Sequence, residues 1–491
     1  MKNMDNSLND ALDKLLAPPV DDSDAVQHIR SILARSNDDL RRILCEGPAV
    51  SAARQVGVVG AGLMGIAIAA THLRAGCDVR LFDIDPKVID TAADRVRTEL
   101  SFQIHDTLEP GFLDDFLPFA EVIEEYSLQK ISTGEINGIF ISSGSNTDDR
   151  RDIDTIMRRL TVTDDIRLLA PCEFIIETVP EQLDIKRNVF AALLAVIGDD
   201  TVIGTNTSTI PISRIAATFP ADAEKSKKRL CGFHFFHPVR SRSLLEVIPA
   251  ETTAPDTVRR AVAQAIAIEK RPMVVGDCPG FLVNRILNPS LSEALELLLE
   301  GATIEQIERV STRFGMAMGP LRILDEIGLD VGMHAGRVLW EAFPDRVIPS
   351  PLLVKLLKNG RLGRKLGQGF FRYESNASWD GPGSSDPEIE DLILRWRRSD
   401  QPHDDREVAA RLLLGMLLEA VRVLEEGKIS GMHDIDLASI FALGFPISRG
   451  GLAHWVDRFG IAETLAILQQ FADLGPRMQP PGLLIRMQVP E

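Results

Sequence analysis

Short apolar runs alternate with amphipathic segments over residues 55–277 of the chain. Apolar runs bounded by turn residues predict buried strands, and apolar residues at helical spacing predict the helices between them. After residue 173 the predicted elements are a strand at 174–178, a helix at 182–198, a strand at 201–205, a helix at 212–219, strands at 231–236 and 244–248, a helix at 256–269 and a strand at 273–276. This alternation predicts an α/β, Rossmann-like domain over residues 53–277.

A glycine-rich turn follows the first apolar run, which covers residues 56–59. Gly60 allows a sharp turn, Gly62 leaves room for a pyrophosphate, and Gly65 lets the next helix lie close to the sheet. The small, apolar helix that follows presents its N-terminal amides to a phosphate. We therefore expect a dinucleotide to bind at this turn, which consists of Gly60, Ala61, Gly62, Leu63, Met64 and Gly65.

Asp83 ends the second apolar strand. A carboxylate at this position accepts hydrogen bonds from the ribose hydroxyls of an adenosine, and it repels a 2′-phosphate. The next three residues, Ile84, Asp85 and Pro86, include no arginine that could reverse this preference. The sequence therefore predicts NAD, rather than NADP, as the cofactor.

Two regions interrupt or precede this alternation. Residues 1–52 hold two amphipathic patterns, which predict a helical N-terminal extension packed on the following domains; an arm that binds a partner is the alternative. Residues from about 105 to 159 are predicted to be an insertion. It contains a helical pattern at 108–130 and a short strand at 139–141, and the sequence does not disclose its role.

The period becomes helical beyond residue 277, and one helical module occurs twice. The segment RILNPSLSEALELLLEG begins at Arg285 and aligns with RLLLGMLLEAVRVLEEG, which begins at Arg411. One offset relates the pairs Arg285 and Arg411, Glu293 and Glu419, Ala294 and Ala420, and Gly301 and Gly427. We predict a first all-α copy at 278–376, a flexible linker at 377–400 and a second copy at 401–491.

Composition and charge narrow the classes of function. The chain of 491 residues is 45% hydrophobic and 25% charged, as in ordinary globular proteins. Its net charge of −17 disfavours nucleic acids and anionic membranes as partners, so a polyanionic substrate needs a local basic patch. No apolar run approaches the roughly 20 residues of a membrane span, and the acidic N-terminal residues, broken by Pro18 and Pro19, predict no signal peptide. Five cysteines without CxxC spacing predict reduced thiols and a cytoplasmic location.

Four motifs follow the glycine turn in order: TNTST at 205–209, GFHFFHPV at 232–239, LLEVI at 244–248 and CPGFLVNRIL at 278–287. Together they resemble the L-3-hydroxyacyl-CoA dehydrogenases, and more closely the dehydrogenase portion of multifunctional fatty-acid β-oxidation enzymes without the hydratase/isomerase domain. The resemblance covers about residues 54–475 and includes GRKLGQGFFRY at 363–373. It implies a Rossmann-like NAD-binding domain, two tandem all-α domains of the family's C-terminal type, and NAD-dependent oxidation of an L-3-hydroxyacyl-CoA thioester to the 3-ketoacyl-CoA.

The resemblance makes His234 the general base and Glu246 its partner, and it assigns the substrate oxygen and the cofactor ring to Ser208 and Asn284. A histidine suits removal of a hydroxyl proton near neutral pH, and a carboxylate on its other ring nitrogen stabilises the imidazolium that forms. Glu246 lies in an otherwise apolar strand, where an unpaired carboxylate is costly to bury, so it needs a partner such as His234. For the cofactor, the resemblance adds Glu181, Lys186, Ser208, His237 and Lys365.

Simpler interpretations of these residues stay open. A histidine in a strand can be a core residue, Ser208 can cap a helix that begins near Pro211, Asn284 can cap or bridge helices, and the lysines can be surface charges. His234 and His237 with a carboxylate could be metal ligands, but the HFFH spacing aims the two imidazoles to opposite faces of a strand, so we expect no metal. The family usually has asparagine where this chain has His237, so we expect a difference in substrate range or pH optimum.

The second helical copy is predicted to be structural, because Ala410 stands where the first copy has Asn284 and no CPGF motif precedes it. In single-module relatives the helical domain pairs with that of another subunit, so we expect a pseudo-dimeric single chain. Arg95 and Arg97 are candidates to contact CoA phosphates. Two alternatives stay beside the acyl-CoA dehydrogenase: a dehydrogenase of a carrier-bound or non-CoA 3-hydroxy acid, and a non-catalytic NAD-binding subunit that scaffolds other β-oxidation enzymes.

Overall fold

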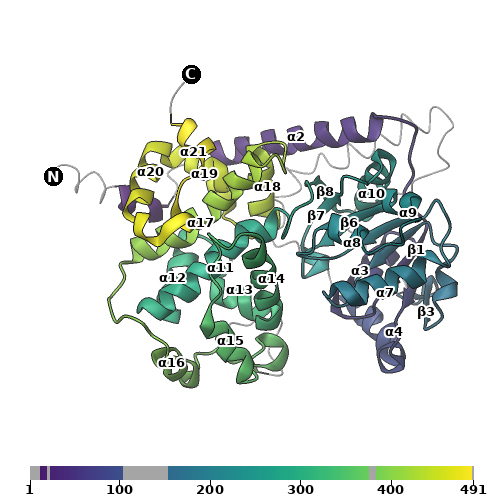
Figure 1. The fold of residues 1–491 in the computed structure, drawn as a ribbon, viewed down its shortest axis with the longest axis horizontal. Coiled ribbons are helices and arrows are strands. Elements are labelled where there is room, and N and C mark those ends of the chain that lie inside the picture. The colour runs from purple at the N-terminus through teal and green to yellow at the C-terminus, as the bar shows by residue number, and fades with distance from the viewer. Residues whose placement is uncertain (1–10, 19–22, 103–152, 375–382, 489–491) are drawn as a thin grey trace. The chain divides into compact units, whose positions relative to one another are not determined.

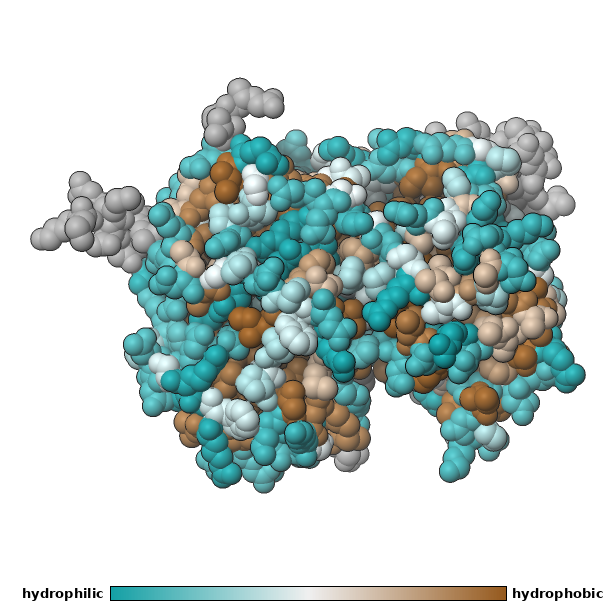
Figure 2. Space-filling model, viewed as in Figure 1, coloured by the Kyte–Doolittle hydropathy of each residue, from teal (hydrophilic) through white to brown (hydrophobic). Residues whose placement is uncertain are grey.

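The computed structural model describes residues 11–18, 23–102, 153–374 and 383–488. The chain divides into two compact units: residues 30–278, called the Rossmann unit below, and residues 1–29 with 279–491, called the helical unit. The helix expected at 108–130 and the strand expected at 139–141 lie outside the described residues. No helix within the described ranges is long and apolar enough to cross a membrane. The face drawn in Figure 2 is mostly hydrophilic.

The Rossmann unit is built on an eight-stranded sheet in the order β3-β2-β1-β4-β5-β6-β7-β8 (Figure 1). Neighbouring strands are parallel throughout, except for the antiparallel pair β6 and β7. The strands are β1 (Gln55–Val59), β2 (Asp78–Phe82), β3 (Leu160–Thr163), β4 (Phe174–Glu177), β5 (Val202–Thr205), β6 (Leu230–Phe235), β7 (Leu244–Pro249) and β8 (Arg271–Val274). The strand order reverses beside β1, as in doubly wound dinucleotide-binding folds, and the predicted fold class is confirmed.

The central strands are continuous apolar runs because they are buried on both faces of the sheet. Every residue of β4, β5 and β6 is buried. The predicted ends of β6 and β8 are wrong by one to two residues, since these strands begin at Leu230 and Arg271. Backbone pairing decides these ends: the Arg271 amide donates to the carbonyl oxygen of Ser243 at 2.7 Å, although neither residue is apolar.

Helices and short 3-10 turns connect the strands of the Rossmann unit. They are α3 (Leu63–Arg74), α4 (Pro86–Ser101), α6 (Ile153–Met157), η1 (Ile166–Leu169), α7 (Leu183–Leu194), α8 (Ile212–Ala216), α9 (Glu224–Lys228), η2 (Val239–Ser241) and α10 (Pro255–Ala267). One hydrophobic cluster joins α3, α4 and α10 to the sheet. Helix α9 was not predicted, because a helix of five residues is too short to show a hydrophobic period.

The N-terminal extension contains one long helix, α2 (Ser23–Cys45), which contributes to both units. Its C-terminal half adds Leu40 and Leu44 to the hydrophobic cluster of the Rossmann unit. Within the helical unit, His28 contacts Asp436 at 2.9 Å, and its ring stacks on that of His454 at 3.9 Å between centroids. These contacts favour the packed extension over an arm that binds a partner.

The helical unit consists of two successive sets of helices. The first set is α11 (Val283–Glu300), α12 (Ile304–Phe314), α13 (Pro320–Ile327), α14 (Leu329–Ala342), α15 (Pro351–Lys358) and the turn η3 (Arg364–Leu366). After α16 (Pro387–Leu394), the second set is α17 (Asp405–Glu425), α18 (Met432–Phe441), η4 (Ile447–Arg449), α19 (Leu452–Phe459), α20 (Ile461–Gln470), η5 (Ala472–Met478) and α21 (Gly482–Arg486). The longest helix of each set, α11 or α17, comes first.

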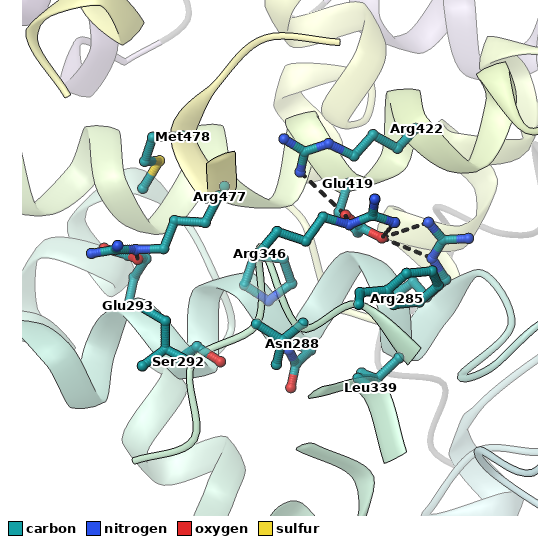
Figure 3. Close-up of a pocket in the computed structure, with 15 residues that line it drawn as sticks. Arg285, Asn288, Ser292, Glu293, Leu339, Arg346, Glu419, Arg422, Arg477 and Met478 are labelled. Carbon is teal, nitrogen blue, oxygen red and sulfur yellow. Dashed lines mark hydrogen bonds and ion pairs between the residues drawn. The ribbon is translucent and has the colours of Figure 1, made fainter. Parts of the chain in front are cut away.

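Helices α11 and α17 pack against each other, and residues at equivalent positions meet. A Cβ atom on Gly415 would lie 3.2 Å from the Cβ of Pro289, so the glycine allows the close approach. Arg285 on α11 donates to Glu419 on α17 at 2.6 Å (Figure 3). Figure 3 also shows Arg346 beside Glu419, which it contacts at 3.1 Å. The two copies therefore share a buried, charged seam between their first helices.

Candidate active site

Strands β1, β4, β5 and β6 end at one edge of the sheet, because they are parallel and in register. Val59 lies beside Glu177, Glu177 beside Thr205, and Thr205 beside Gly232. Ligands of open α/β sheets bind at this carboxyl edge. The glycine turn, the TNTST turn and the end of the GFHFFHPV motif therefore all leave the sheet at the edge where a ligand is expected.

The glycine turn joins β1 to α3 and leaves backbone amides uncovered. Gly60 has a φ of +102°, in the left-handed region that favours glycine. A Cβ on Gly65 would lie 1.8 Å from the carbonyl oxygen of Gly60, so only glycine lets α3 begin this close to the strand. Among the described residues, no atom lies within 4 Å of a Cβ built on Gly62, and no side chain caps the N-terminus of α3. Open space beside uncapped amides fits the pyrophosphate of a dinucleotide.

Asp83 lies at the tip of β2, next to this turn. Its carboxylate accepts hydrogen bonds from the backbone amides of Ala61 at 2.7 Å and Asp85 at 3.0 Å. The neighbouring Ile84 is 85% exposed, which leaves an apolar surface where a flat adenine ring could lie. Arg95 donates to the carbonyl oxygen of Ala61 at 2.8 Å, and it thereby fixes the turn from the side of α4. The candidate role of Arg95 in binding CoA phosphates stays a hypothesis.

His234 and Glu246 are direct partners across the antiparallel pair of strands β6 and β7. Nδ1 of His234 lies 2.7 Å from Oε2 of Glu246, and the two residues are 4% and 0% exposed. An ionised carboxylate can only accept, so this contact places the proton on Nδ1 and makes Nε2 the basic ring atom. The ring of Phe236 lies edge-on to that of His234, with 4.7 Å between centroids. A buried imidazole backed by a carboxylate can take up a proton and stabilise the resulting charge.

Two carboxylates hold the TNTST turn: Glu177 accepts from the Thr205 hydroxyl at 2.6 Å, and Glu181 binds residues 207–209. Oε1 of Glu181 accepts hydrogen bonds from the Thr207 hydroxyl at 2.6 Å, from the Ser208 amide at 2.9 Å and from the Thr209 amide at 3.0 Å. Oε2 of the same side chain lies 3.3 Å from Nζ of Lys186. Burial raises the pKa of Glu181, but Lys186 and these hydrogen bonds together bring that pKa below its ordinary value.

Lys186 is 1% exposed, so its interpretation as a surface charge is wrong. Its ammonium group also donates to both oxygens of Glu177, at 2.8 and 2.9 Å. Burial lowers the pKa of Lys186, but Glu177 and Glu181 outweigh that effect and raise the pKa above its ordinary value. The sequence analysis missed Glu177, although a carboxylate at the end of an apolar strand is the same signal that pointed to Glu246.

Ser208 does not cap helix α8. That N-terminus is capped by Asp277, whose carboxylate accepts from the amides of Ile212 at 2.7 Å and Ser213 at 2.8 Å. The alternative interpretation of Ser208 is therefore wrong. Asp277 was missed because it lies 65 positions from Ile212 in the sequence, and no local capping pattern connects them.

His237 lies beyond the end of β6, which stops at Phe235. The sequence analysis placed the imidazoles of His234 and His237 on opposite faces of one strand. This argument is wrong, because His237 is not in the strand. Burial, together with the positive charges of Arg240 and Arg242, lowers the pKa of His237 to about 4. Within the described ranges, no group of three or more His, Cys, Asp or Glu residues could hold a metal ion.

Two predicted site residues, Asn284 and Lys365, belong to the helical unit. Asn284 is the second residue of α11, whose N-cap residue is Leu282, so Asn284 is not the helix cap. Lys365 lies in η3 and forms an ion pair with Asp330, and its side chain is 44% exposed. Both roles stay predictions.

The GRKLGQGFFRY segment is held by a residue that the sequence analysis missed. Asp325 accepts hydrogen bonds from the amides of Phe370 at 2.8 Å and Phe371 at 2.9 Å, and from the Tyr373 hydroxyl at 3.0 Å. A Cβ on Gly369 would lie 1.9 Å from Oδ1 of Asp325, which explains the glycine. Burial raises the pKa of Asp325 to about 6, against the opposing effect of these hydrogen bonds.

A doubly wound sheet with a glycine turn and a buried histidine–glutamate pair at its carboxyl edge defines a class of protein, the NAD-dependent dehydrogenases. Family models agree. The 3-hydroxyacyl-CoA dehydrogenase NAD-binding domain matches residues 55–110 and 124–278, and the 3-hydroxyacyl-CoA dehydrogenase C-terminal domain matches residues 280–373. The chain belongs to the 3-hydroxyacyl-CoA dehydrogenase family, and NAD is its cofactor.

Solved structures with the same fold extend the comparison. FadB2 of M. tuberculosis is 30% identical over 66% of this chain and 100% of its own, with a TM-score of 0.53. The dehydrogenase part of multifunctional enzyme 1 from C. elegans is 26% identical over 89% of each chain, with a TM-score of 0.55. The 3-hydroxybutyryl-CoA dehydrogenase of Escherichia coli K12 shares the fold at 23% identity, over 89% of this chain and 98% of its own, with a TM-score of 0.66.

Proposed function

We propose that the protein oxidises an L-3-hydroxyacyl-CoA thioester to the 3-ketoacyl-CoA and reduces NAD. The observation that carries this proposal is the buried contact of 2.7 Å between His234 and Glu246, at the edge of the sheet where the glycine turn also lies. Family membership supports the reaction class, and the geometry supplies the base that oxidation of a secondary alcohol requires.

His234 removes the proton from the 3-hydroxyl group through Nε2. Glu246 holds Nδ1 and stabilises the imidazolium, and its burial beside the ring makes that stabilisation stronger than it would be in water. The hydroxyl group of Ser208 and the amide group of Asn284 orient the substrate oxygen. NAD, when bound, would supply the acceptor for the hydride that leaves the carbinol carbon.

The remaining residues bind and orient the cofactor. Amides of the glycine turn would hold the pyrophosphate, and Asp83 would accept hydrogen bonds from the ribose hydroxyls of the adenosine. Glu181 and Lys186 anchor the turn that carries Ser208, next to the position proposed for the nicotinamide. His237 stays neutral near pH 7 because burial lowers its pKa to about 4, so it can serve as a polar, uncharged neighbour of the cofactor in place of asparagine.

Reduction of acetoacetyl-CoA by NADH, followed by the loss of NADH absorbance, tests the proposal. The substitution His234→Gln is expected to lower kcat by about 10²- to 10⁴-fold, the range for losing a general base. His403→Gln is a matched control: this histidine also contacts a glutamate, Glu407 at 3.0 Å, but it lies in the second helical copy. Unchanged turnover in the His234 variant would remove the proposed role of this residue.

Turnover of other substrates and binding of NADH distinguish the proposed function from its two alternatives. A dehydrogenase of a free or carrier-bound 3-hydroxy acid should turn over 3-hydroxybutyrate, or its carrier thioester, better than 3-hydroxybutyryl-CoA. A scaffold subunit should bind NADH without turning over any of these substrates. The contact between His234 and Glu246 favours the enzyme, since a scaffold has no need to bury a carboxylate beside an imidazole.

A further inference from the structure

Strands β5 and β6 do not end at the same level of the sheet. Pairing between them stops at Thr205 and Gly232, whereas β6 continues to Phe235 and still pairs with β7 there. The amide of Phe235 lies beyond the last pair of β5 and β6, and this residue is 2% exposed. A buried amide without an acceptor is costly, so an acceptor has to come from outside the strand ladder.

Asn206, the residue that follows β5, supplies this acceptor. Its Oδ1 accepts a hydrogen bond from the Phe235 amide at 2.8 Å, so a side chain continues the ladder where backbone pairing has ended. The amide of Asn206 donates to the carbonyl oxygen of Glu177, the last residue of β4, at 2.8 Å. Asn206 is thus fixed at its backbone by β4 and bonded through its side chain to β6. The sequence analysis assigned a role to Ser208 in the TNTST motif but none to this asparagine.

The strands end differently because two predicted site residues need opposite backbone conformations. His234 has to stay in a strand, since the antiparallel pairing of β6 with β7 places it opposite Glu246. Ser208 has to leave the sheet, because a side chain inside a parallel ladder points at a covering helix instead of at the carboxyl edge. Strand β5 accordingly ends at Thr205, before Ser208. Asn206 keeps the turn and the strand connected at the point where they part.

The hydrogen bond acts on His234 through the peptide group that joins this residue to Phe235. A peptide group is planar, so holding its N–H also fixes the direction of the His234 carbonyl group and the backbone from which the imidazole projects. The ring is held separately at Nδ1, where Glu246 lies 2.7 Å away. Ser208 is held through its amide by Glu181 at 2.9 Å. Each site residue therefore has its own anchor, and the hydrogen bond at Phe235 joins the two anchored groups.

We propose that Asn206 is a positioning residue, which keeps the hydroxyl group of Ser208 and Nε2 of His234 at the spacing that one substrate oxygen requires. This inference rests on the proposed function, in which both groups contact the oxygen of the 3-hydroxyl group. Each group has to lie within about 2.6–3.2 Å of that oxygen, so a shift of about 1 Å between the turn and the strand breaks one of the two contacts. Asn206 takes no part in proton transfer.

Reduction of acetoacetyl-CoA by NADH tests this role in the Asn206→Ala variant. We expect kcat per NADH-binding site to fall by about 10- to 100-fold, in line with a misplacement of about 1 Å, while the dissociation constant of NADH changes by less than about twofold. Counting the sites by a fluorescence titration with NADH excludes misfolded molecules. Asn206→Asp keeps the acceptor oxygen and should retain most of the natural kcat.

Thr253→Val is the matched control. The Thr253 hydroxyl also donates to the backbone of β6, to the carbonyl oxygen of Leu230 at 2.6 Å, but it does so at the opposite end of the strand. Its replacement removes a hydrogen bond from the same strand without touching the turn that carries Ser208. We expect kcat to stay unchanged, and an equal loss in this variant would overturn the inference.

A double-mutant cycle with Ser208→Ala separates positioning from general damage to the fold. If Asn206 acts by aligning the Ser208 hydroxyl with His234, its replacement should matter little once that hydroxyl is gone. We expect Asn206→Ala to lower kcat by less than about threefold in the Ser208→Ala background. A purely structural role would lower kcat by the same factor in both backgrounds.

The remaining results contradict either the inference or the proposed function. An unchanged kcat in Asn206→Ala, or losses that multiply in the double variant, overturns the inference and leaves the proposed function standing. An aspartate variant as slow as the alanine variant also overturns it, because the acceptor oxygen would then not matter. Loss of NADH binding in both variants would assign Asn206 to the cofactor site, with the same consequence. A natural protein that binds NADH but does not reduce acetoacetyl-CoA overturns the proposed function, and the inference with it.

Discussion

Arg285 and Arg411 occupy equivalent positions in the two helical copies, and each binds glutamates of the other copy. Arg285 pairs with Glu419 at 2.6 Å, whereas Arg411 pairs with Glu293 at 2.7 Å. The two arginines are each 1% exposed. The pairing is reciprocal, because Glu419 follows Glu293 by the same number of positions as Arg411 follows Arg285. Such reciprocity is the signature of an isologous interface between identical subunits, here formed within one chain.

A second reciprocal pair extends this symmetry. Arg346, which follows α14, contacts Glu419 at 3.1 Å, and Arg477 in η5 contacts Glu293 at 2.6 Å. Each buried glutamate therefore contacts two arginines of the other copy, and Glu419 also contacts Arg422 of its own helix at 3.2 Å. We propose that the second copy takes the place of a partner subunit, so that the chain is a pseudo-dimeric monomer. Sedimentation equilibrium that yields a dimer mass, lost when the α11 surface is altered, would contradict this proposal.

Replacing Arg411 by methionine should destabilise the protein strongly. Glu293 and Glu300 would lose their shared cation, and removing one partner of a buried pair typically costs about 3–5 kcal/mol. Urea unfolding measures the change. Arg337→Met removes an exposed pair with Glu341 and should cost no more than about 0.5 kcal/mol. Equal effects of the two substitutions would mean that the seam contributes little to stability.

Glu246→Gln should lower kcat by about 100-fold or more while changing KM little, because the amide cannot stabilise a positive charge on His234. Steady-state kinetics of acetoacetyl-CoA reduction measures both constants. Glu251→Gln, at an exposed glutamate just after β7, is the control. Similar kcat values for the two variants would make Glu246 a structural residue only.

Glu181→Gln should lower kcat about tenfold, because the turn that carries Ser208 loses the charge that faces Lys186. The dissociation constant of NADH, measured by fluorescence, shows whether the side chain also contacts the cofactor. Glu224→Gln on α9, exposed and far from the turn in sequence, controls for the change in net charge. A loss of NADH affinity with kcat intact would assign Glu181 to cofactor binding alone.

Asp83→Ala should raise KM for NAD by about tenfold and should reduce the discrimination against NADP, because the carboxylate both accepts ribose hydroxyls and repels a 2′-phosphate. The measurement is kcat/KM with each cofactor. Asp78→Asn, at the exposed start of the same strand, is the control. Discrimination that survives in the Asp83 variant would place cofactor selection elsewhere.

Glu308 should make stability depend on pH. It accepts hydrogen bonds from the amides of Gly319 and Leu321, and burial raises its pKa to about 7 against the lowering effect of these bonds. A raised folded-state pKa means that the group stabilises the fold below about pH 4.5 and that this contribution is lost as the pH rises through about 7. Glu308→Gln stays neutral and should remove this loss, at most about 3 kcal/mol.

Urea midpoints at pH 5 and pH 8 provide the measurement for Glu308. The stability of the Glu308→Gln variant relative to that of the natural protein should increase from pH 5 to pH 8. Glu305→Gln lies on the same helix at an exposed position and should show no such gain. A constant difference between the Glu308 variant and the natural protein at both pH values would exclude a titration of this group.

Much of the Rossmann unit could be predicted because its signals are local. The glycine turn has a steric cause at each position, and the confirmed fold class follows from apolar runs that the buried sheet requires. The need of Glu246 for a partner also follows from burial in an apolar strand. The roles assigned to these residues stay predictions until they are measured.

Other features could not be predicted because they depend on residues that are distant in sequence. The antiparallel pairing of β6 with β7 places His234 opposite Glu246, and Asp277 reaches the N-terminus of α8 across 65 positions. Asp325 holds the segment at Phe370 in the same way. A sequence window contains a carboxylate without the distant amides and hydroxyls that donate to it, so these hydrogen bonds cannot be recognised from the sequence.

The sequence by itself determined the dinucleotide fold, the duplicated helical module and the residue types of a hydride-transfer site, because apolar period, glycine sterics and motif order are written along the chain. The tertiary structure alone decided which charges are satisfied. It buried Lys186 between Glu177 and Glu181, and it paired the first arginine of each helical copy with glutamates of the other copy. It left the guanidinium of Arg242 without a partner among the described residues. Pairing of buried charges depends on distances in space, and these exist only once the chain has folded.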